Sequence, residues 1–476
     1  MRQKTFKWAA YCLICFLVFL LVGGAFVFLI HRPDGHNYAK QAEPQRFLGA
    51  GTGPDKAVII EERAFSGISR INLIENARES IQIAYHAVHD GLASDMFYGL
   101  ILEAAGRDVQ VQLLFDGIFH NLYWREKATY WALVDHPNIE IRFYEPLNLL
   151  KPWTLNNRMH DKFMVIDNKY ALLGGRNIGD QYFMENCQGK MIKDRDVLLY
   201  NTAPDALHES VLSAFGDYFD LLWCHSYTVE KHENVPSRQQ LKARQRHQLL
   251  LDNLAVIRQQ HPEYFGEKID WEQYAYSTSK VSLITNPIQR MNKEPWILSE
   301  IAAIYTAAED TILLQSPYII PSRHIKSYVD SSRTKAEVYY LTNSKASSAN
   351  YFAIAGYLKH RDRLAEQATQ IYEYHGPGSI HAKTYVFDMR LSVIGSFNMD
   401  ARSSFLSTES MVVIDSEMFA EELAQSMKGL AKQSVPYIEE APSFVAHTAN
   451  PQPVPWHKTV LVWLLRIMLY PFDALL

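Results

Sequence analysis

The chain contains two copies of one pattern, MHDKFMVIDNKYALLGGRNIG beginning at Met159 and IHAKTYVFDMRLSVIGSFNMD beginning at Ile380. The copies align without a gap, and polar residues and glycines recur at matching positions: His160 and His381, Lys162 and Lys383, Asp167 and Asp388, Gly174 and Gly395, Asn177 and Asn398. In each copy two apolar strings flank a polar segment, which predicts a strand, a turn and a returning strand. A long repeat of this kind predicts a duplicated domain.

The shared residue types suit chemistry on a phosphate. A His and a Lys two positions apart on a strand project from the same face, because side chains alternate along a strand. Lysine supplies a compact positive charge for a phosphate oxygen, and an asparagine amide donates hydrogen bonds to another oxygen. Histidine can attack phosphorus or transfer a proton near neutral pH. One copy therefore provides half a site, and two copies provide a histidine on each side of one phosphate.

The duplicated H-x-K-x4-D pattern resembles the signature of the phospholipase D superfamily. The strings GGRNIGDQYF and GSFNMDARS, which follow the two motifs, are similar to the bacterial cardiolipin synthase branch, the C-type most of all. The resemblance covers nearly all of residues 56–440. It implies an α/β fold in which two similar phospholipase D-like halves pack around one shared active site.

The resemblance also implies roles for individual residues. The expected catalytic set consists of the motif residues His160, Lys162, Asp167, His381, Lys383 and Asp388. Within it, the two aspartates are expected to be structural turn or ion-pair residues rather than proton carriers. Asn177 and Asn398 are expected to bind phosphate. Downstream carboxylates orient the histidines in such proteins, and we expect Glu409 to orient His381 and Asp196 to orient His160. We expect His160 to be the attacking histidine.

The leading functional hypothesis is a phosphatidyltransferase that makes cardiolipin or a related phospholipid through a phosphohistidine intermediate. A phospholipase D-type hydrolase and a membrane-anchored nuclease of the same fold are the alternatives, and a non-enzymatic lipid-binding scaffold is disfavoured because both motifs are complete. We expect no cofactor and no metal, because no cluster of ligands with metal-binding spacing accompanies the motifs. The net charge of -5 argues against nucleic acid as the main partner. The expected partners are a phospholipid substrate and the membrane, and the oligomeric state is left open.

The N-terminus carries a candidate membrane anchor. Residues 8–30 form an uncharged run of 23 residues, which is long enough to cross a bilayer as one helix. Arg2, Lys4 and Lys7 precede the run, so the positive-inside bias favours a cytoplasmic N-terminus and a catalytic domain outside the cytoplasmic membrane. The C-terminal stretch Trp456–Leu476 is apolar but interrupted by charges, and predicts either a helix lying on the bilayer or one packed on the core.

The predicted organisation follows from these features and is, in chain order, a membrane anchor at 1–30, a linker at 31–55, a first phospholipase D-like half at 56–225, a helical connector at 226–280, a second half at 281–440 and an apolar tail at 441–476. A disulfide between Cys187 and Cys224 is open if the domain is exported, and a reduced, buried pair is the simpler expectation.

Overall fold

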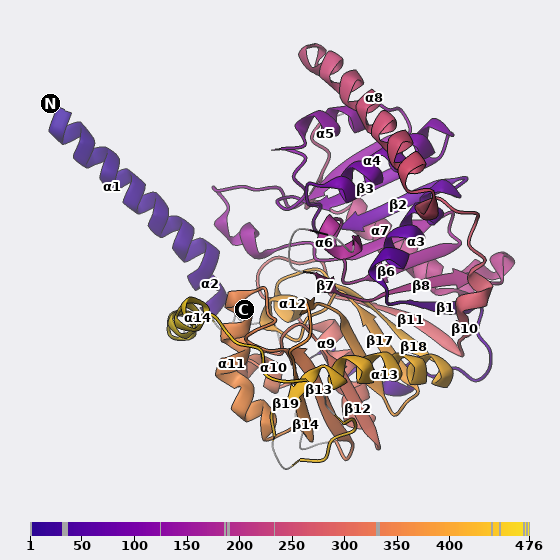
Figure 1. Cartoon of the computed structure of the whole chain (residues 1–476). Helices are drawn as coiled ribbons and strands as arrows, with labels where there is room; N and C mark the ends of the chain where they lie inside the picture. The colour runs from indigo at the N-terminus through magenta and orange to yellow at the C-terminus, as the bar shows by residue number, and fades with distance from the viewer. Residues whose placement is uncertain are drawn as a thin grey trace.

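Two β-sheets with matching strand order form the framework of the protein (Figure 1). The computed structural model describes residues 2–30, 37–123, 125–184, 187, 191–232, 234–329, 334–438, 441–446, 449–469, 472 and 475. The first sheet has the order β10-β1-β8-β6-β5-β2-β3-β4-β9, and the second has the order β11-β18-β17-β16-β12-β13-β14-β19. From β1 and β11 onward the two orders correspond strand by strand, which confirms the predicted pair of similar α/β halves.

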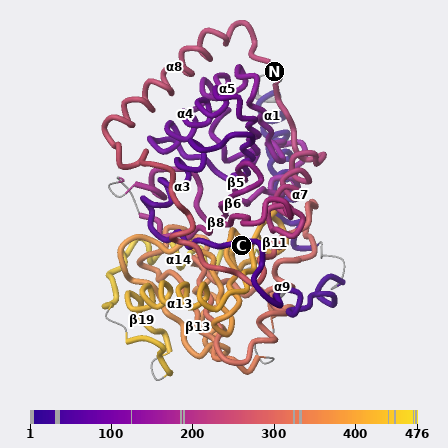
Figure 2. Tube along the Cα trace, turned by 90° about the vertical axis from the view of Figure 1, so that its right-hand side faces the viewer, coloured from indigo at the N-terminus to yellow at the C-terminus, as the bar shows by residue number. Residues whose placement is uncertain are grey.

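The first half alternates strands with covering helices. Its strands are β1 (Asp55–Ile60), β2 (Ser80–Tyr85), β3 (Gln110–Asp116), β4 (Ile139–Tyr144), β5 (Lys162–Ile166), β6 (Tyr170–Gly174), β8 (Asp196–Asn201), β9 (Thr228–Val229) and β10 (Ala275–Ser277). Its helices are α3 (Arg63–Glu75), α4 (Leu92–Gly106), α5 (Lys127–Val134), α6 (Asp180–Phe183), α7 (Val211–Trp223) and α8 (Ser237–Gln260). The α8 helix packs on α4 and α5 at the far end of this half (Figure 2).

The second half repeats this arrangement. Its strands are β11 (Lys280–Thr285), β12 (Thr311–Gln315), β13 (Glu337–Asn343), β14 (Gln370–Tyr374), β16 (Lys383–Phe387), β17 (Leu391–Gly395), β18 (Ser410–Asp415) and β19 (Ser434–Pro436). Its helices are α9 (Trp296–Ala307), α10 (Arg323–Lys326), α11 (Tyr351–Ala365), α12 (Ala401–Phe405), α13 (Glu417–Lys432) and α14 (Trp456–Met468).

The two halves share a hydrophobic core. Phe215 and Phe219 of α7 lie in one buried cluster with Val412 of β18 and with Phe419 and Leu423 of α13. A short parallel pair of strands, β7 (Ile192–Lys193) and β15 (Ser379–Ile380), also joins the halves. Because apolar burial and backbone pairing both cross this boundary, the halves are held in one fixed orientation.

Each motif forms the predicted hairpin. β5 pairs antiparallel with β6, and β16 pairs antiparallel with β17. The turn residues Asp167 and Asn168 in the first copy, and Asp388 and Met389 in the second, have φ between 48° and 52°. Positive φ at both central residues is the geometry of a tight hairpin turn.

The N-terminal apolar run is helical throughout. It comprises α1 (Arg2–Leu21), the π-helical turn η1 (Val22–Phe26) and α2 (Val27–Ile30). Thr5–Ile30 is a candidate single membrane span, with mean hydropathy 3.1 and 6% of its most apolar window buried in the protein. α1 projects away from the body of the molecule (Figure 1). The described part of the predicted linker, residues 37–55, packs on the second half, where Phe47 is buried and Tyr38 stacks on Trp296.

The cysteines are free. Cys187 is half-buried and Cys224 is exposed, so the expectation of a buried pair was wrong.

Candidate active site

The first motif histidine is held by a carboxylate from the other half of the protein. His160 Nδ1 lies 2.8 and 2.9 Å from the two carboxylate oxygens of Glu409, which is fully buried. The backbone aligns the two residues, because the His160 N–H donates to the Thr408 carbonyl and the Thr408 N–H donates to the Arg158 carbonyl. The expectation that Glu409 orients His381 was therefore wrong.

The second motif histidine has the equivalent arrangement, with a carboxylate from the first half. His381 Nδ1 lies 2.6 Å from Oδ2 of Asp194, a buried residue of the first half. The His381 N–H donates to the Lys193 carbonyl next to the β7–β15 pair. Each histidine thus receives its carboxylate from the opposite half, and each is placed by backbone hydrogen bonds across the boundary between the halves.

Strand register explains why the carboxylate is Asp194 rather than Asp196. The motif glycine Gly174 pairs with Asp196, and the equivalent Gly395 pairs with Met411. Two residues before each of these partners lie Asp194 and Glu409, which are therefore equivalent. Their distances from the motif histidines of their own halves differ, 194 - 160 = 34 against 409 - 381 = 28, so spacing alone did not identify the pair.

Asp196 has a structural role instead of the expected role beside His160. Its Oδ2 accepts hydrogen bonds from Arg70 Nη1 and Arg176 Nη1, both at 2.9 Å, and from Ser66 Oγ at 2.6 Å. These groups are buried, so the carboxylate balances two guanidinium charges in the interior of the first half.

The two motif lysines lie beside the histidines. Lys383 Nζ is 3.0 Å from His381 Nδ1, and Lys162 Nζ donates to the His160 carbonyl. Both lysines are about 1% exposed. Burial lowers the pKa of Lys162 to about 7, with Glu409 opposing the shift and Lys383 adding to it, and burial lowers the pKa of Lys383 to about 8. The charge of Lys383 thus acts on Lys162 in the opposite half, in agreement with the hydrogen bond between His160 and Glu409 that joins the two half-sites.

Burial and the nearby lysine charges favour the neutral form of both histidines. Burial, followed by the charges of Lys162, Lys383, His381 and Arg402, places the pKa of His160 well below its usual value. Burial and Lys383 lower the pKa of His381 to about 4, and Asp194 opposes this shift. A neutral imidazole has a ring nitrogen with a free lone pair, which a nucleophile or a base requires.

The two orienting carboxylates differ in how strongly the site favours their ionised form. Burial raises the pKa of Glu409 to about 8, with Lys162 opposing the shift. Burial would also raise the pKa of Asp194, but His381 and Lys383 outweigh burial and hold it well below its usual range. Asp194 is therefore the more strongly ionised carboxylate, and it favours a positive charge on His381 more than Glu409 favours one on His160.

The motif asparagines lie at the same end of the hairpins. Asn177 Nδ2 donates to the Tyr182 hydroxyl at 3.0 Å, and Asn398 Nδ2 donates to the Tyr318 hydroxyl at 3.3 Å. The Tyr182 ring in turn lies 6.1 Å from the His381 ring. Within the described residues, the Oδ1 atoms of both asparagines are buried and have no hydrogen-bond partner.

The motif aspartates, in contrast, cap backbone groups at the other end of the hairpins. Asp167 accepts hydrogen bonds from the N–H groups of residues 78–80, and Asp388 accepts them from residues 309–311. Each aspartate ties its hairpin turn to the start of the neighbouring strand, β2 or β12. Their inclusion in the catalytic set was wrong, whereas the expectation of structural turn residues is confirmed.

Three further residues border the site and carried no distinctive sequence signal. The His86 ring lies 4.8 Å from the His160 ring, and its Nδ1 contacts the Met159 carbonyl at 2.6 Å. Ser396 Oγ donates a hydrogen bond to Glu409. Lys293 is buried, and burial lowers its pKa to about 7 against the opposing charges of Asp161 and Glu409. Of the three, His86 directly follows the strand β2.

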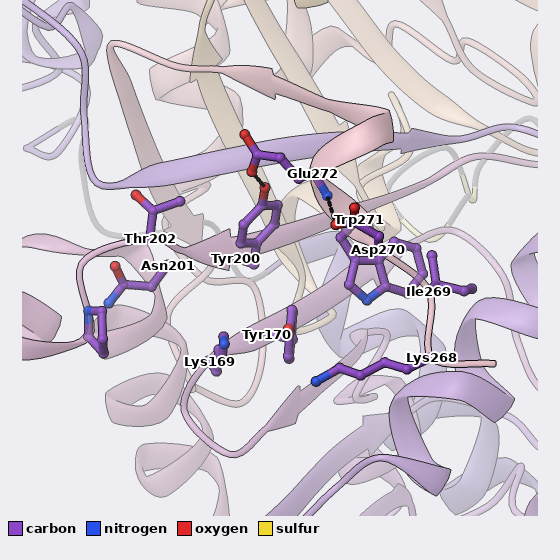
Figure 3. Close-up of a pocket in the computed structure, with 11 residues that line it drawn as sticks. Lys169, Tyr170, Tyr200, Asn201, Thr202, Lys268, Ile269, Asp270, Trp271 and Glu272 are labelled. Atoms are coloured by element: carbon purple, nitrogen blue, oxygen red, sulfur yellow. Dashed lines mark hydrogen bonds between the residues drawn. The ribbon is translucent and has the colours of Figure 1, made fainter.

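A surface pocket of about 460 Å³ lies elsewhere (Figure 3). Lys169, Tyr170, Tyr200 and Trp271 line it, and Tyr200 donates a hydrogen bond to Glu272. Lys169 sits in the β5–β6 turn, at the opposite end of the hairpin from His160. This pocket is therefore separate from the candidate active site.

The described residues contain no group of three or more His, Cys, Asp or Glu side chains arranged to hold a metal ion. Lys162 and Lys383 place positive charge beside the two histidines.

Comparison with known proteins identifies the family. A family model described as "Cardiolipin synthase, PLD-like domain" matches residues 71–201 and again residues 301–431. The chain belongs to this phospholipase D-like cardiolipin synthase family. The two matched segments contain both motif hairpins and both orienting carboxylates, so the duplication seen in the sheets is the duplication of the family domain.

Several relatives span most of the chain. Cardiolipin synthase C of Escherichia coli K12 is 27% identical over 390 residues, covering 74% of this chain and 80% of its own length. An uncharacterized protein of Helicobacter pylori 26695 is 25% identical over 441 residues, covering 84% and 83%. The crystal structure of phosphatidylserine synthase from Haemophilus influenzae superposes with a TM-score of 0.58 at 15% identity, covering 85% of this chain and 92% of the other. That likeness supports the fold of this cardiolipin synthase family member.

Proposed function

We propose that this protein is a phosphatidyltransferase that makes cardiolipin or a related phospholipid through a phosphohistidine intermediate. The observation that carries the proposal is the pair of motif histidines, each held by a buried carboxylate from the opposite half, with a buried lysine beside each. Family membership and the similarity to cardiolipin synthase C of E. coli support a phospholipid as the substrate.

In the first step, His160 Nε2 attacks phosphorus. His381 enters this step as the imidazolium, which it forms when the negatively charged phosphodiester binds beside it and which Asp194 stabilises. The N–P bond forms, the bond from phosphorus to the leaving alcohol breaks, and that alcohol takes the Nε2 proton of His381, which becomes neutral. We assign the acid role to His381 because the ionised Asp194 beside it stabilises the imidazolium that donates the proton. Lys162 and Lys383 balance the negative charge that grows on the phosphate oxygens.

In the second step, the hydroxyl of an incoming lipid gives its proton to His381 and attacks phosphorus. The N–P bond breaks and neutral His160 is regenerated, so that protons and bonds balance over the cycle. We assign the phosphate contacts of Asn177 and Asn398 to their amide groups. A half-turn of each amide lets the tyrosine hydroxyl donate to Oδ1 and points Nδ2 at a phosphate oxygen, which satisfies the unpartnered oxygen as well.

The membrane orientation is part of the proposal. Arg2, Lys4 and Lys7 favour a cytoplasmic N-terminus, which places the catalytic domain outside the cytoplasmic membrane. Protease added to intact spheroplasts should then digest the domain, and full protection would place it in the cytoplasm.

Product analysis tests the activity. Purified full-length protein in phosphatidylglycerol vesicles, alone or with phosphatidylethanolamine, should release cardiolipin as the main product, and His160→Ala should release none. Phosphatidic acid as the dominant product would identify a hydrolase. Cleavage of single-stranded DNA without lipid turnover would identify a nuclease.

A further inference from the structure

The C-terminal helix α14 has two apolar faces, and only one of them is covered. Val462 and Leu465 are buried in the core of the second half, and buried Lys458 donates from Nζ to the carbonyls of Ala346 at 3.1 Å and Ser348 at 2.8 Å. The opposite face exposes seven large apolar side chains: Trp456, Val460, Leu461, Trp463, Leu464, Ile467 and Met468. The helix is thus fixed in place with an apolar stripe turned outward.

This outward stripe lies beside the end of the candidate membrane span. Phe28 of α2 is 1% exposed and belongs to the same buried cluster as Val462 and Leu465. In Figure 1, α14 is seen end-on next to α2, whereas α1 runs across the picture, so the two helices lie crosswise. A helix that crosses a bilayer along its normal therefore places α14 along the membrane surface.

The depth of α14 also fits a bilayer surface. From Trp8, the first residue of the uncharged run, to Phe28 is 28 - 8 = 20 residues. At 1.5 Å per residue this is about 30 Å, the thickness of the hydrocarbon core. If Trp8 lies at one interface, α14 lies at the other, where tryptophan is favoured. Arg466 is exposed on the same helix and suits lipid phosphates.

The end of the span is built into the catalytic domain, so it cannot pivot freely. Asn156 Nδ2 donates to the Gly24 carbonyl at 2.6 Å, and Asn292 Nδ2 donates to the Phe28 carbonyl at 2.8 Å. A Cβ atom on Gly23 would lie 2.5 Å from Pro152 Cγ, which shows how closely the span approaches the 3-10 turn η3 (Pro152–Asn156).

The same contacts lead towards the active site. The side chain of Asn156 also accepts a hydrogen bond from Arg402 Nη2 at 3.2 Å. Arg402 lies in α12, directly after the second motif, and its charge lowers the pKa of His160. The loop before η3 exposes Leu147, Leu149 and Leu150. One residue therefore separates the span from a charged group of the active site.

We propose that the outer face of α14 is a membrane-contact surface that lies in the bilayer interface and, together with the docked end of the span, holds the catalytic domain in one orientation. The occupant of this face is the phospholipid bilayer itself. The contact rests on the placement of α14 rather than on the proposed reaction, but it would deliver that reaction its lipid substrates from the bilayer. An intermediate that water can hydrolyse is also better protected when the opening of the active site lies against a lipid surface.

Site-specific labels test the surface in the full-length protein. The native cysteines are first replaced by serine, and Leu464→Cys is then introduced and labelled with an environment-sensitive dye. The labelled protein is placed in phosphatidylglycerol nanodiscs. The matched control is Met418→Cys, because Met418 is an exposed apolar residue of α13, away from α1 (Figure 1). We expect nitroxide on the lipid chains to quench the dye at position 464 at least threefold more than at position 418, and a water-soluble quencher to show the reverse.

Two results would overturn the proposal. One is equal quenching at both positions, which would mean that α14 faces water. The other is protection of position 464 from both quenchers together with crosslinks between chains, which would identify a second copy of the protein as the occupant. Neither result depends on catalysis, so this experiment remains decisive even if no cardiolipin is formed.

A double variant tests whether the contact of α14 with the bilayer affects turnover. Trp463→Ser combined with Leu464→Ser changes only outward side chains, and leaves Val462 and Leu465 packed in the core. We expect its turnover of any lipid product to fall about tenfold on vesicles and to stay within twofold of wild type in detergent–lipid micelles, where no planar surface has to be met. Equal turnover on vesicles, or an equal loss in both media, would contradict a role for this face in reaching the bilayer.

Discussion

Replacing the orienting carboxylates tests the crossed arrangement of the site most directly. Glu409→Gln and Asp194→Asn keep the shape of each side chain and remove its charge. A hydrogen bond to a charged group contributes about 1.5–3 kcal/mol, and the charge is needed most when the histidine becomes positive during reaction. Taking about 3 kcal/mol at 1.36 kcal/mol per tenfold change, we expect Asp194→Asn to lose about 100-fold in kcat. We expect Glu409→Gln to lose less, because burial already pushes Glu409 towards protonation.

The neighbouring Asp196→Asn is the matched control. Asp196 contacts Arg70 and Arg176 and neither histidine, so its replacement leaves two buried guanidinium groups without their counter-charge. Loss of one partner of a buried pair costs about 3–5 kcal/mol of folding free energy. We therefore expect a clear fall in Tm with kcat per folded molecule changed only a few-fold.

Single-turnover and steady-state assays on phosphatidylglycerol vesicles, with thermal unfolding of the same samples, separate the two effects. Asp194→Asn and Glu409→Gln should change kcat far more than Tm, and Asp196→Asn should do the opposite. If Asp196→Asn lowers kcat as much as Asp194→Asn does while Tm is unchanged, the assignment of carboxylates from strand register is refuted.

Three further predictions concern the phosphate site. His160→Ala and His381→Ala should each abolish turnover. A phosphoenzyme trapped by rapid denaturation at alkaline pH should form slowly on His381→Ala, which lacks the acid of the first step, but not on His160→Ala; labelling of the latter would reverse the assigned roles. The pKa values of about 7 and 8 for Lys162 and Lys383 mean that their charge is present at lower pH and lost as the pH rises through this range, so kcat/KM should fall above about pH 8, and a profile flat to pH 10 would contradict this. Activity should persist in excess chelator, and loss that is restored by a divalent ion would contradict metal independence.

The local features of the motifs could be predicted from sequence. The hairpins follow from apolar strings that flank a polar turn, and the matched glycines follow from the close approach of neighbouring strands. A Cβ atom on Gly174 would collide with Asp196, and one on Gly395 would collide with the Ser410 carbonyl. Such constraints act between residues close in the chain or in one hairpin, where pattern and side-chain size are informative.

The partners of the histidines could not be predicted in this way. Their identity depends on which segment of the opposite half pairs with the start of each motif, and on a loop between motif and carboxylate that is longer in the first half. Within the sequence DRD, Asp194 and Asp196 are chemically equivalent candidates. Only the register against Gly174 distinguishes the residue that faces His381 from the one that neutralises Arg70 and Arg176.

The packing of the two ends of the chain could also not be predicted from local sequence alone. Composition predicted a linker after the span, yet Arg46 pairs with buried Glu300 at 2.6 Å and Phe47 is 1% exposed. For the tail, the sequence left a bilayer helix and a core-packed helix open, and α14 is packed on the core by one face only. A polar, Gly-rich composition indicates only that a segment has no strong preference for helix or strand. Such a segment can still pack on a surface that other parts of the chain form.

The crossed carboxylates also explain how a duplicated domain can carry out two different roles. If each half supplied its own carboxylate, each histidine would be complete within its half, and the boundary between halves would only have to hold the phosphate. Here His160 pairs with Glu409 and His381 pairs with Asp194, so neither half contains both a motif histidine and the carboxylate that orients it. The exchange also lets the two carboxylates differ. Glu409 is pushed towards protonation by burial, whereas Asp194 is kept ionised by His381 and Lys383. In the proposed mechanism, a symmetric fold thereby acquires one histidine suited to attack and one suited to proton transfer, because the asymmetry resides in the carboxylates and not in the motifs.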